Sequence, residues 1–297
     1  MCVIFFYANA EPSPGGYKLI LASNRDEFYA RETQQVGKWS QAQHVYGGID
    51  LEPGREGGTW LAIGHHQDVF KVGALLNLTG EPKPRNAIAL NILQPHQQIP
   101  TNNEHFLLGR GMIVADYVKE SSKEFNSMNY NRRLLKDCNQ YSAFNFVSIE
   151  ITPTSAQIQL LSNVPPTLAQ FEPGKSYGFG NSLPSSPFQK VSHGQQQFEA
   201  TVREHGNASV DVLSSHLLEL LKNKHKFWPD PELQRRAPNW GEGLSSLNVF
   251  IDHQGYGSRT HTVILVDSQN KMHFIEETMA GLDPEGEWLH KHIEKQF

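Results

Sequence analysis

Cysteine and long apolar runs are both scarce in this sequence of 297 residues. Its two cysteines, Cys2 and Cys138, are too few for a disulfide framework, which favours a reducing compartment. No apolar run approaches the roughly 18 residues of a membrane-spanning helix, so we expect no transmembrane segment. Acidic residues outnumber basic ones, with 26 Lys and Arg against 31 Asp and Glu and a net charge of -5. That balance argues against nucleic acid as a partner.

The amino-terminal segment lacks the features of a targeting sequence. A secretory signal needs basic residues ahead of an apolar stretch and a small-residue cleavage site, and residues 1–7 have neither. Lys18 is the first basic residue and follows Glu11, which argues against an Arg-rich transit peptide. We therefore expect a cytoplasmic protein.

Strand patterns lie mainly toward the two ends of the chain. Short apolar runs at 2–7 and 17–23 are separated by a turn rich in Pro and Gly, which predicts a hairpin. Residues 59–63 and 72–76 predict a second pair of buried strands. Similar runs predict further strands over 144–149, 158–161, 247–251, 262–267 and 272–277.

Helical periodicity is strongest in the middle of the chain. It predicts helices over 104–119, over 126–139 and most clearly over 209–224, where Ser209 is placed to cap the first turn. A final amphipathic helix is expected around Trp288 and His292.

The order of these elements predicts the fold class. Strand-rich ends around a helical middle indicate an α+β fold of antiparallel sheets with helices packed outside. The polar, Pro-rich stretch 227–243 is expected to be a long loop. No shift in composition marks a boundary, so we expect a single domain over 1–297.

Cys2 is the first candidate for catalysis. Removal of Met1 would leave a thiol and a free α-amine on the same residue. The amine has an unperturbed pKa of about 8 and the thiol one of about 8.5, so the amine can take the thiol proton. Amino-terminal nucleophiles work in this way. The alternative is that Cys2 is only the first residue of a buried strand.

Four polar residues, 24–27, follow the second predicted strand. If the first two strands pair as a hairpin, Asp26 returns close to Cys2, and its carboxylate can hold and orient the α-ammonium group. Arg25 can offset that carboxylate or lower the pKa of the thiol. The alternative is a solvated, charged turn.

Three more polar residues complete the candidate set. Asn77 follows a predicted strand and Asn181 lies in a Gly-rich stretch, and their amide groups can donate hydrogen bonds to an oxyanion. Either can instead be a turn former. Arg259 precedes an apolar strand and can bind a substrate carboxylate or support the nucleophile.

Metal and cofactor motifs are not recognisable in the sequence. The 14 histidines show no ligand spacing, and neither cysteine lies in a haem-attachment motif. Phosphate- and dinucleotide-binding fingerprints are also missing. We therefore expect no metal site and no required cofactor.

Eight short motifs follow one another along the chain: MCVIFF at 1–6, LILASNRDEFY at 19–29, EGGTWL at 56–61, ALLN at 74–77, GRG at 109–111, FNF at 144–146, YGFGNS at 177–182 and GYGSRT at 255–260. Together and in this order they resemble the NRDE family. The resemblance runs from residue 1 to about residue 279. Arg31-Glu32-Thr33 departs from the family pattern, in which Pro usually follows the Arg, and Gly180 stands where Ser is common.

The resemblance implies an Ntn-hydrolase-like αββα sandwich. The penicillin-acylase and bile-salt-hydrolase branch of that superfamily uses an amino-terminal Cys, an Arg/Asp pair, two Asn and a late Arg. Arg25 and Asp26 are adjacent here, a spacing that differs from that branch. The positions that match by motif order are Cys2, Arg25, Asp26, Asn77, Asn181 and Arg259.

Two functional hypotheses follow. The resemblance implies a role in Golgi organisation and secretion, lipid and mitochondrial homeostasis and haem trafficking. In that role the protein is a soluble carrier of haem, an acyl lipid or acyl-CoA, in the cytoplasm with mitochondrial and Golgi association. The residues themselves favour a cysteine hydrolase that cleaves a non-peptide C–N amide or a thioester, with Cys2 as nucleophile and its α-amine as base. We favour the carrier as the physiological role.

Overall fold

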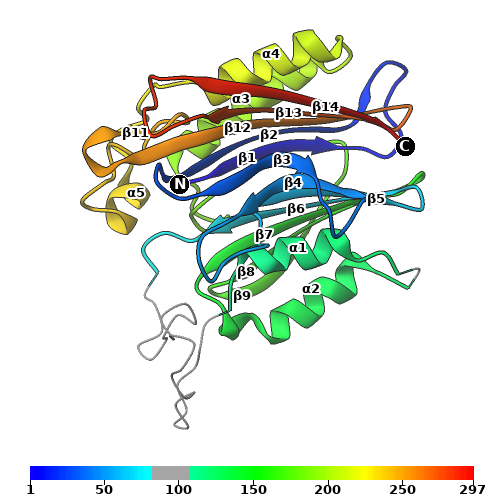
Figure 1. The fold of residues 1–297 in the computed structure, drawn as a ribbon, viewed down its shortest axis with the longest axis horizontal. Coiled ribbons are helices and arrows are strands. Elements are labelled where there is room, and N and C mark those ends of the chain that lie inside the picture. Colours follow the sequence, from blue (N-terminus) through cyan, green and yellow to red (C-terminus); the bar gives the residue numbers. More distant parts are fainter. Residues whose placement is uncertain (82–107, 123) are drawn as a thin grey trace.

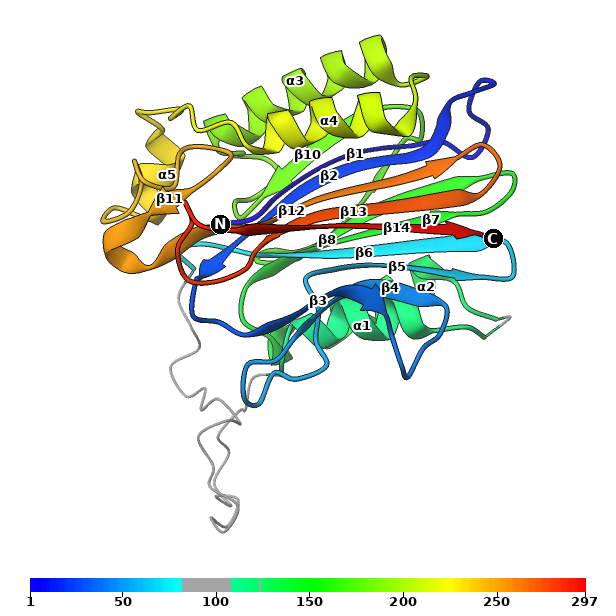
Figure 2. The ribbon, with the colours of Figure 1, turned by 45° about the horizontal axis from the view of Figure 1, so that its top comes forward.

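The computed structural model describes residues 1–81, 108–122 and 124–297. Within them, two antiparallel sheets lie face to face, and helices cover the outer face of each sheet (Figure 1, Figure 2). The layers therefore follow the order helix, sheet, sheet, helix. The predicted α+β fold of antiparallel sheets flanked by helices is confirmed.

The first sheet has the strand order β10-β1-β2-β12-β13-β14, and the short β11 pairs with β12. Two helices, α3 (Gln189–His205) and α4 (Val210–Leu221), cover its outer face, and α5 (Pro231–Arg236) lies near one end (Figure 2). Its strands are β1 (Val3–Ala8), β2 (Tyr17–Phe28), β10 (Ser176–Gly180), β11 (Phe250–Ile251), β12 (Tyr256–Asp267), β13 (Lys271–Met279) and β14 (Trp288–Gln296).

The second sheet runs in sequence order from β3 to β9. Its outer face carries α1 (Gly111–Lys119) and α2 (Ser127–Lys136) (Figure 1). Short 3-10 turns occur at Cys138–Gln140 and Asp252–Gln254. Its strands are β3 (Thr33–Lys38), β4 (Val45–Asp50), β5 (Leu61–His66), β6 (Val69–Asn77), β7 (Phe144–Ile151), β8 (Ala156–Asn163) and β9 (Pro166–Phe171).

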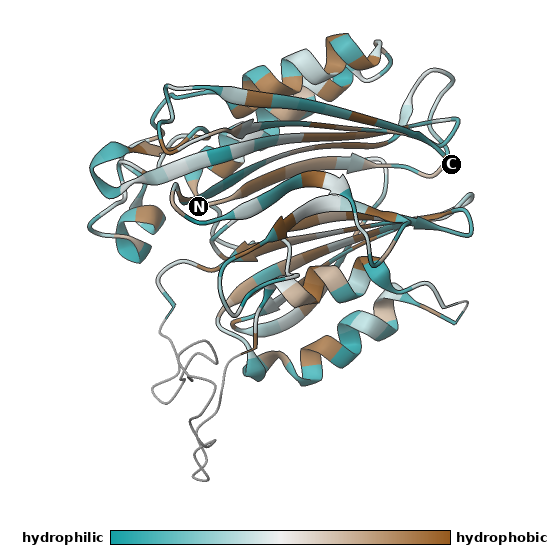
Figure 3. Ribbon diagram, viewed as in Figure 1, coloured by the Kyte–Doolittle hydropathy of each residue, from teal (hydrophilic) through white to brown (hydrophobic). Residues whose placement is uncertain are grey.

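The pattern along β1 shows why the chain folds into layers. Ile4 and Phe6 lie in the core between the two sheets, whereas Val3 and Phe5 lie in the core beneath α3 and α4. Successive strand residues point to opposite faces, so an uninterrupted apolar run fits a strand buried on both sides. A third core lies between the second sheet and its helices. Figure 3 shows hydrophobic residues recurring along the central strands.

The clearest helix predicted from the sequence is confirmed as α4. The Ser209 side chain accepts a hydrogen bond from the backbone N–H of Val212 at the first turn. Leu213, Leu217 and Leu221 are buried against the first sheet. The i, i+4 spacing therefore places these leucines on one face of the helix, and that face packs on the sheet.

The two predicted strand pairs are also confirmed, although β2 is longer than expected. The strand continues to Phe28, so residues 24–27 lie within it and do not follow it. The reason is β12, which pairs with this polar end of β2 and places Ser258 opposite Asp26. A neighbouring strand satisfies the backbone groups there, so the polar side chains do not end the strand.

The expected helix around Trp288 and His292 is wrong, because both residues lie in β14, paired with β13. Apolar residues recur every four positions at Leu289, Ile293 and Phe297, which is the spacing of a helix face. Four is also a multiple of two, so the same spacing fits one face of a strand. Ile293 and Phe297 pack against the core between the sheets.

Other differences concern segments with weak patterns. The helix expected over 104–119 appears as α1, and residues 104–107 lie outside the described residues. The loop expected over 227–243 contains α5, and α3 was not predicted. Among the described residues, no helix is long and apolar enough to cross a membrane.

Candidate functional site

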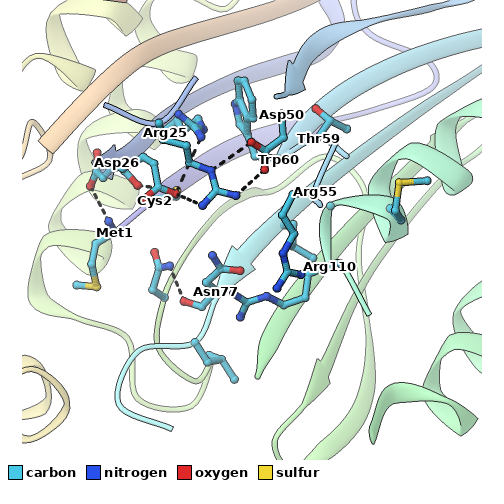
Figure 4. Close-up of a pocket in the computed structure, with 18 of the residues that line it drawn as sticks. Met1, Cys2, Arg25, Asp26, Asp50, Arg55, Thr59, Trp60, Asn77 and Arg110 are labelled. Atoms are coloured by element: carbon cyan, nitrogen blue, oxygen red, sulfur yellow. Dashed lines mark hydrogen bonds and ion pairs between the residues drawn. The ribbon is translucent and has the colours of Figure 1, made fainter. Parts of the chain in front are cut away.

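A cavity of about 390 Å³ opens at the end of the sandwich where β1 begins (Figure 4). The first sheet contributes Cys2, Arg25 and Asp26 to its lining, and Asn77 comes from the end of β6 in the second sheet. Asn181, just after β10, lies in the same lining. Five of the six residues selected from the sequence therefore meet at one cavity.

Cys2 lies beside the polar end of β2 because β1 and β2 pair in register, with Val3 opposite Asn24. Its Sγ is 3.9 Å from the backbone oxygen of Asp26. Burial raises the pKa of the Cys2 thiol, and the nearby positive chain terminus partly opposes this effect. The thiol is thus protonated at neutral pH and needs a base before it can act as a nucleophile.

Asp26 anchors the start of the chain. Its Oδ2 is 3.4 Å from the α-ammonium nitrogen of Met1, and its Oδ1 accepts a hydrogen bond from Ser258 Oγ at 2.6 Å. The same ammonium group donates to the hydroxyl of Tyr256, which donates in turn to the backbone oxygen of Asp26. The predicted proximity of Asp26 to Cys2 is confirmed, and the ammonium group that Asp26 contacts here is that of Met1.

A buried lysine, Lys190, lies behind Asp26 and was not predicted from the sequence. The Nζ of Lys190, in α3, is 3.9 Å from Asp26 Oδ2 and donates a hydrogen bond to the backbone oxygen of Ser246 at 3.0 Å. Both charged side chains are almost completely buried, and burial lowers the pKa of Lys190. No sequence motif marks Lys190, because its role depends on how α3 packs over the sheet.

Arg25 lies on the opposite face of β2 from Asp26 and points into the cavity. Its guanidinium carbon is 4.3 Å from the centre of the Trp60 ring, an arrangement that favours a cation–π contact. Glu27 approaches it at 4.0 Å. Burial lowers the pKa of Arg25. Arg25 therefore forms a positively charged wall beside Cys2.

The two asparagines contact each other across the cavity. Asn181 Nδ2 donates to the backbone oxygen of Asn77 at 2.5 Å, and the backbone N–H of Thr79 donates to the backbone oxygen of Asn181. These bonds tie the end of β6 to the residue that follows β10. One N–H of the Asn181 amide is used in this way, which leaves its second N–H as the group that can donate to a bound molecule.

Arg259 is the one candidate that does not line the cavity. It lies at an irregularity in the pairing of β12 with β2, and its Nη1 donates to the backbone oxygens of Phe28 and Arg31. Burial lowers its pKa to about 10. The geometry makes Arg259 a residue that positions the segment after β2 and does not line the cavity.

Two further arginines, Arg55 and Arg110, lie side by side at the cavity (Figure 4). Arg110 Nη1 donates to the backbone oxygen of Ala143 at 2.8 Å. Burial lowers the pKa of Arg110 to about 10, and the positive charge of Arg55 adds to the effect. Within the part of the chain that the structure describes, neither guanidinium lies within 4.0 Å of a carboxylate. This differs from Arg31, which pairs with Asp50 at 2.6 Å.

Asn24, the first residue of the NRDE motif, points away from the cavity and is fully buried. Its Nδ2 donates to the backbone oxygens of Leu221 and Leu247, at 2.8 and 2.9 Å. Its Oδ1 is 2.7 Å from His261 Nδ1. Asn24 therefore joins the end of α4 to the sheet and has a structural role.

Comparison with known proteins agrees with the motifs. The family model described as "Transport and Golgi organisation 2" matches residues 1–281. The Drosophila melanogaster protein named "Transport and Golgi organization protein 2" is 67% identical over 299 residues, which cover 100% of this chain and 99% of the fly protein. The Homo sapiens "Transport and Golgi organization protein 2 homolog" is 30% identical over 288 residues, which cover 95% of each chain. This chain therefore belongs to the transport and Golgi organisation 2 family.

Proposed function

We propose that the cavity around Cys2 binds an anionic small molecule and that the protein is a carrier for that molecule. The observation that carries this proposal is the pair of guanidinium groups, Arg55 and Arg110, with no carboxylate partner among the described residues. Positive charges at the wall of a partly buried cavity attract anions, and guanidinium groups bind carboxylates and phosphates by paired hydrogen bonds.

The shape and lining of the cavity support a ligand of this kind. A volume of about 390 Å³ lies in the range of small-molecule sites. Trp60, Leu75 and Leu78 add apolar surface next to the charged groups. Haem, with its carboxylates, and acyl-CoA, with its phosphates, both combine apolar and anionic parts.

The family supports the biological setting that we propose for this carrier. The names of the relatives refer to transport and Golgi organisation. We infer a role in Golgi organisation and secretion, lipid and mitochondrial homeostasis and haem trafficking. We place the protein in the cytoplasm, in association with mitochondria and the Golgi.

The carrier proposal can be tested by direct binding of haem and of palmitoyl-CoA to the full chain. Arg55→Gln and Arg110→Gln should each weaken binding by about 10- to 100-fold, because a hydrogen bond to a charged group contributes about 1.5–3 kcal/mol. The matched control is Arg203→Gln, since Arg203 is exposed on α3. The proposal fails if neither ligand binds at micromolar concentration, or if the control loses as much affinity as the cavity variants.

A second function, an amide or thioester hydrolase, is favoured by a different observation. Asp26 lies beside both the Cys2 thiol and the α-ammonium group that begins the chain. With Met1 in place that group belongs to Met1, so this activity requires removal of Met1. The α-amine of Cys2 could then take the thiol proton, with Asp26 holding the resulting ammonium.

The residues at the cavity supply the nucleophile, the base and the oxyanion donors for each step of that reaction. The thiolate of Cys2 attacks the carbonyl carbon, and amide N–H groups of Asn77 and Asn181 stabilise the oxyanion. The C–N or C–S bond breaks, the leaving group takes the proton from the α-ammonium, and water then hydrolyses the acyl-enzyme.

The intact mass of the protein isolated from its own cells separates the two functions. A mass lacking one methionine, followed by acyl-probe labelling that Cys2→Ser abolishes and Cys138→Ser preserves, supports the hydrolase. Retained Met1 or an acetylated terminus removes the base and contradicts it. Under the carrier proposal, Cys2→Ala retains ligand binding.

A further inference from the structure

A second cluster of reactive side chains lies at the outer edge of the first sheet, away from the Cys2 cavity. It consists of His273 on β13 and of His292 and Glu294 on β14, the last strand of that sheet. The cavity lies where β1 begins, whereas Glu294 lies close to the carboxyl end of the chain. The two chain ends lie on opposite sides of the molecule (Figure 2).

Strand geometry brings the three side chains to one face. His292 and Glu294 are two residues apart on the same strand and therefore point the same way. His273 is the direct cross-strand partner of Glu294 in the pairing of β13 with β14. Residues that pair directly across two strands have side chains on the same side of the sheet. The two histidines are 19 residues apart in the chain, so the cluster could not be predicted from a short ligand spacing in the sequence.

The distances among the three ligand atoms are those of a metal site. His273 Nδ1 is 3.1 Å from His292 Nε2 and 3.5 Å from Glu294 Oε1, and His292 Nε2 is 3.8 Å from that same Oε1. The nearest point equidistant from these three atoms lies in their plane, about 2.0 Å from each, as the three sides of the triangle require. Zinc bonds to imidazole nitrogen and carboxylate oxygen have the same length, about 2.0–2.2 Å.

We propose that His273, His292 and Glu294 bind a divalent transition metal ion of the Zn²⁺ type. Two imidazoles and one carboxylate form a donor set that proteins use for zinc, with a fourth position open to water. His292 and Glu294 are exposed, so solvent reaches that fourth position. The ion would lie on the outer face of the sheet.

The neighbours of the cluster fit this role. Lys271 Nζ contacts Glu294 Oε2 at 2.6 Å, whereas Glu294 Oε1 is the oxygen that faces the histidines. Lys271 therefore holds the carboxylate by the oxygen that the metal does not need, as outer partners of metal ligands do. His290, on the same strand face, is 3.9 Å from Glu277 and is left outside the site.

A metal ion at this site would link the edge strand β14 to its neighbour β13. β14 has a strand partner on one side only within the described sheet, and its side chains are mostly exposed. An ion bound by both β13 and β14 stabilises the folded protein in proportion to its concentration relative to its dissociation constant. Metal binding is therefore expected to raise the thermal midpoint of the protein.

The test uses the full chain, freed of metal by a chelator and titrated with Zn²⁺ against a chromogenic competitor. We expect one equivalent to bind, and binding to weaken by about 100-fold or more in His292→Ala and in Glu294→Gln, since even loss of an outer partner costs about 10–100-fold. Co²⁺ should give the visible absorption of a four-coordinate ion in the wild type and in the control, but in neither of the two test variants. The matched control is His253→Ala, an exposed histidine elsewhere on the surface.

Both test residues are exposed on β14, so their variants should fold, and equal unfolding midpoints without metal would confirm this. The Zn²⁺-dependent rise in midpoint should be present in wild type and His253→Ala and lost in the two test variants. The proposal is overturned if wild type binds no stoichiometric Zn²⁺, if the test variants bind like wild type, or if His253→Ala loses as much affinity.

Discussion

Replacement of Asp26 by Asn should strongly destabilise the protein, because it leaves a buried lysine without its negative partner. The Asp26 carboxylate and the Lys190 ammonium are 3.9 Å apart, and neither side chain has more than 1% of its surface exposed. The introduced asparagine would keep the size of the side chain and could still accept a hydrogen bond from Ser258. The substitution therefore removes charge with little change in packing.

The expected size of the effect follows from the distance. Two unit charges 3.9 Å apart attract each other by about 4 kcal/mol at an effective dielectric constant of about 20. The loss also has an upper limit, because Lys190 can release its proton. Neutralising a lysine of ordinary pKa costs about 4.6 kcal/mol at pH 7. We therefore expect Asp26→Asn to lower the free energy of unfolding by about 3–4 kcal/mol, in line with other broken buried pairs.

The assay is urea unfolding of four proteins: wild type, Asp26→Asn, Lys190→Met and the double variant. If the charge pair is the cause, the double variant loses less stability than the two single losses added together. Met1 also contacts Asp26, but Lys190→Met leaves that contact in place. The comparison of the four proteins therefore measures the interaction energy between Asp26 and Lys190 alone. A loss below about 1 kcal/mol for Asp26→Asn, or additive losses, would refute the reasoning.

The stability contributed by Lys190, and the cost of Asp26→Asn, should both change with pH in a direction that the pKa of Lys190 sets. Burial lowers the pKa of Lys190 below its usual value of 10.5, so at alkaline pH the unfolded chain binds more protons than the folded protein. The lysine contribution to stability therefore rises with pH across that window. Without Asp26 the pKa falls further, and the penalty of Asp26→Asn should shrink from about pH 7 to about pH 10.

Asn24→Ala should lower the free energy of unfolding, measured in urea, by about 2–4 kcal/mol, because it leaves the buried backbone oxygens of Leu221 and Leu247 without this donor. The control is Asn207→Ala at the surface. An equal loss of stability in the control would contradict a structural role for Asn24. In a Cys138→Ser background, Cys2 should react with iodoacetamide at least about 10-fold more slowly than free cysteine at pH 7 and faster as pH rises, because burial raises the pKa of its thiol. Rapid labelling at neutral pH would show that the thiolate already forms.

Much of the fold could be predicted where the pattern is local. The hairpin of β1 and β2 and the face of α4 come from short apolar runs and regular spacing. The helix α3 was missed because Gly194 and three consecutive glutamines interrupt its apolar face. A Cβ at Gly194 would lie 2.4 Å from Phe5 Cζ, so glycine is needed where the helix approaches β1. That reason becomes visible only when the helix is packed on the sheet.

The candidate site was predictable to a similar extent. The hairpin alone brings Asp26 to Cys2, and the motif order added Asn77 and Asn181. Lys190, Arg55 and Arg110 could not be found, because their importance depends on which charges they meet after folding. Sequence spacing carries information about neighbours along one strand or helix, and little about contacts between elements far apart in the chain.

The burial of Met1 affects when it can be removed. Its side chain is 5% exposed, and its amine is held by Asp26 and by Tyr256, which lies 255 residues further along the chain. At about 5–20 residues per second, a ribosome needs roughly 13–50 s to add those residues. During that time Met1 lacks its partner Tyr256, so its amine is less enclosed than in the folded protein. We therefore expect any removal of Met1 to be faster during synthesis than after folding.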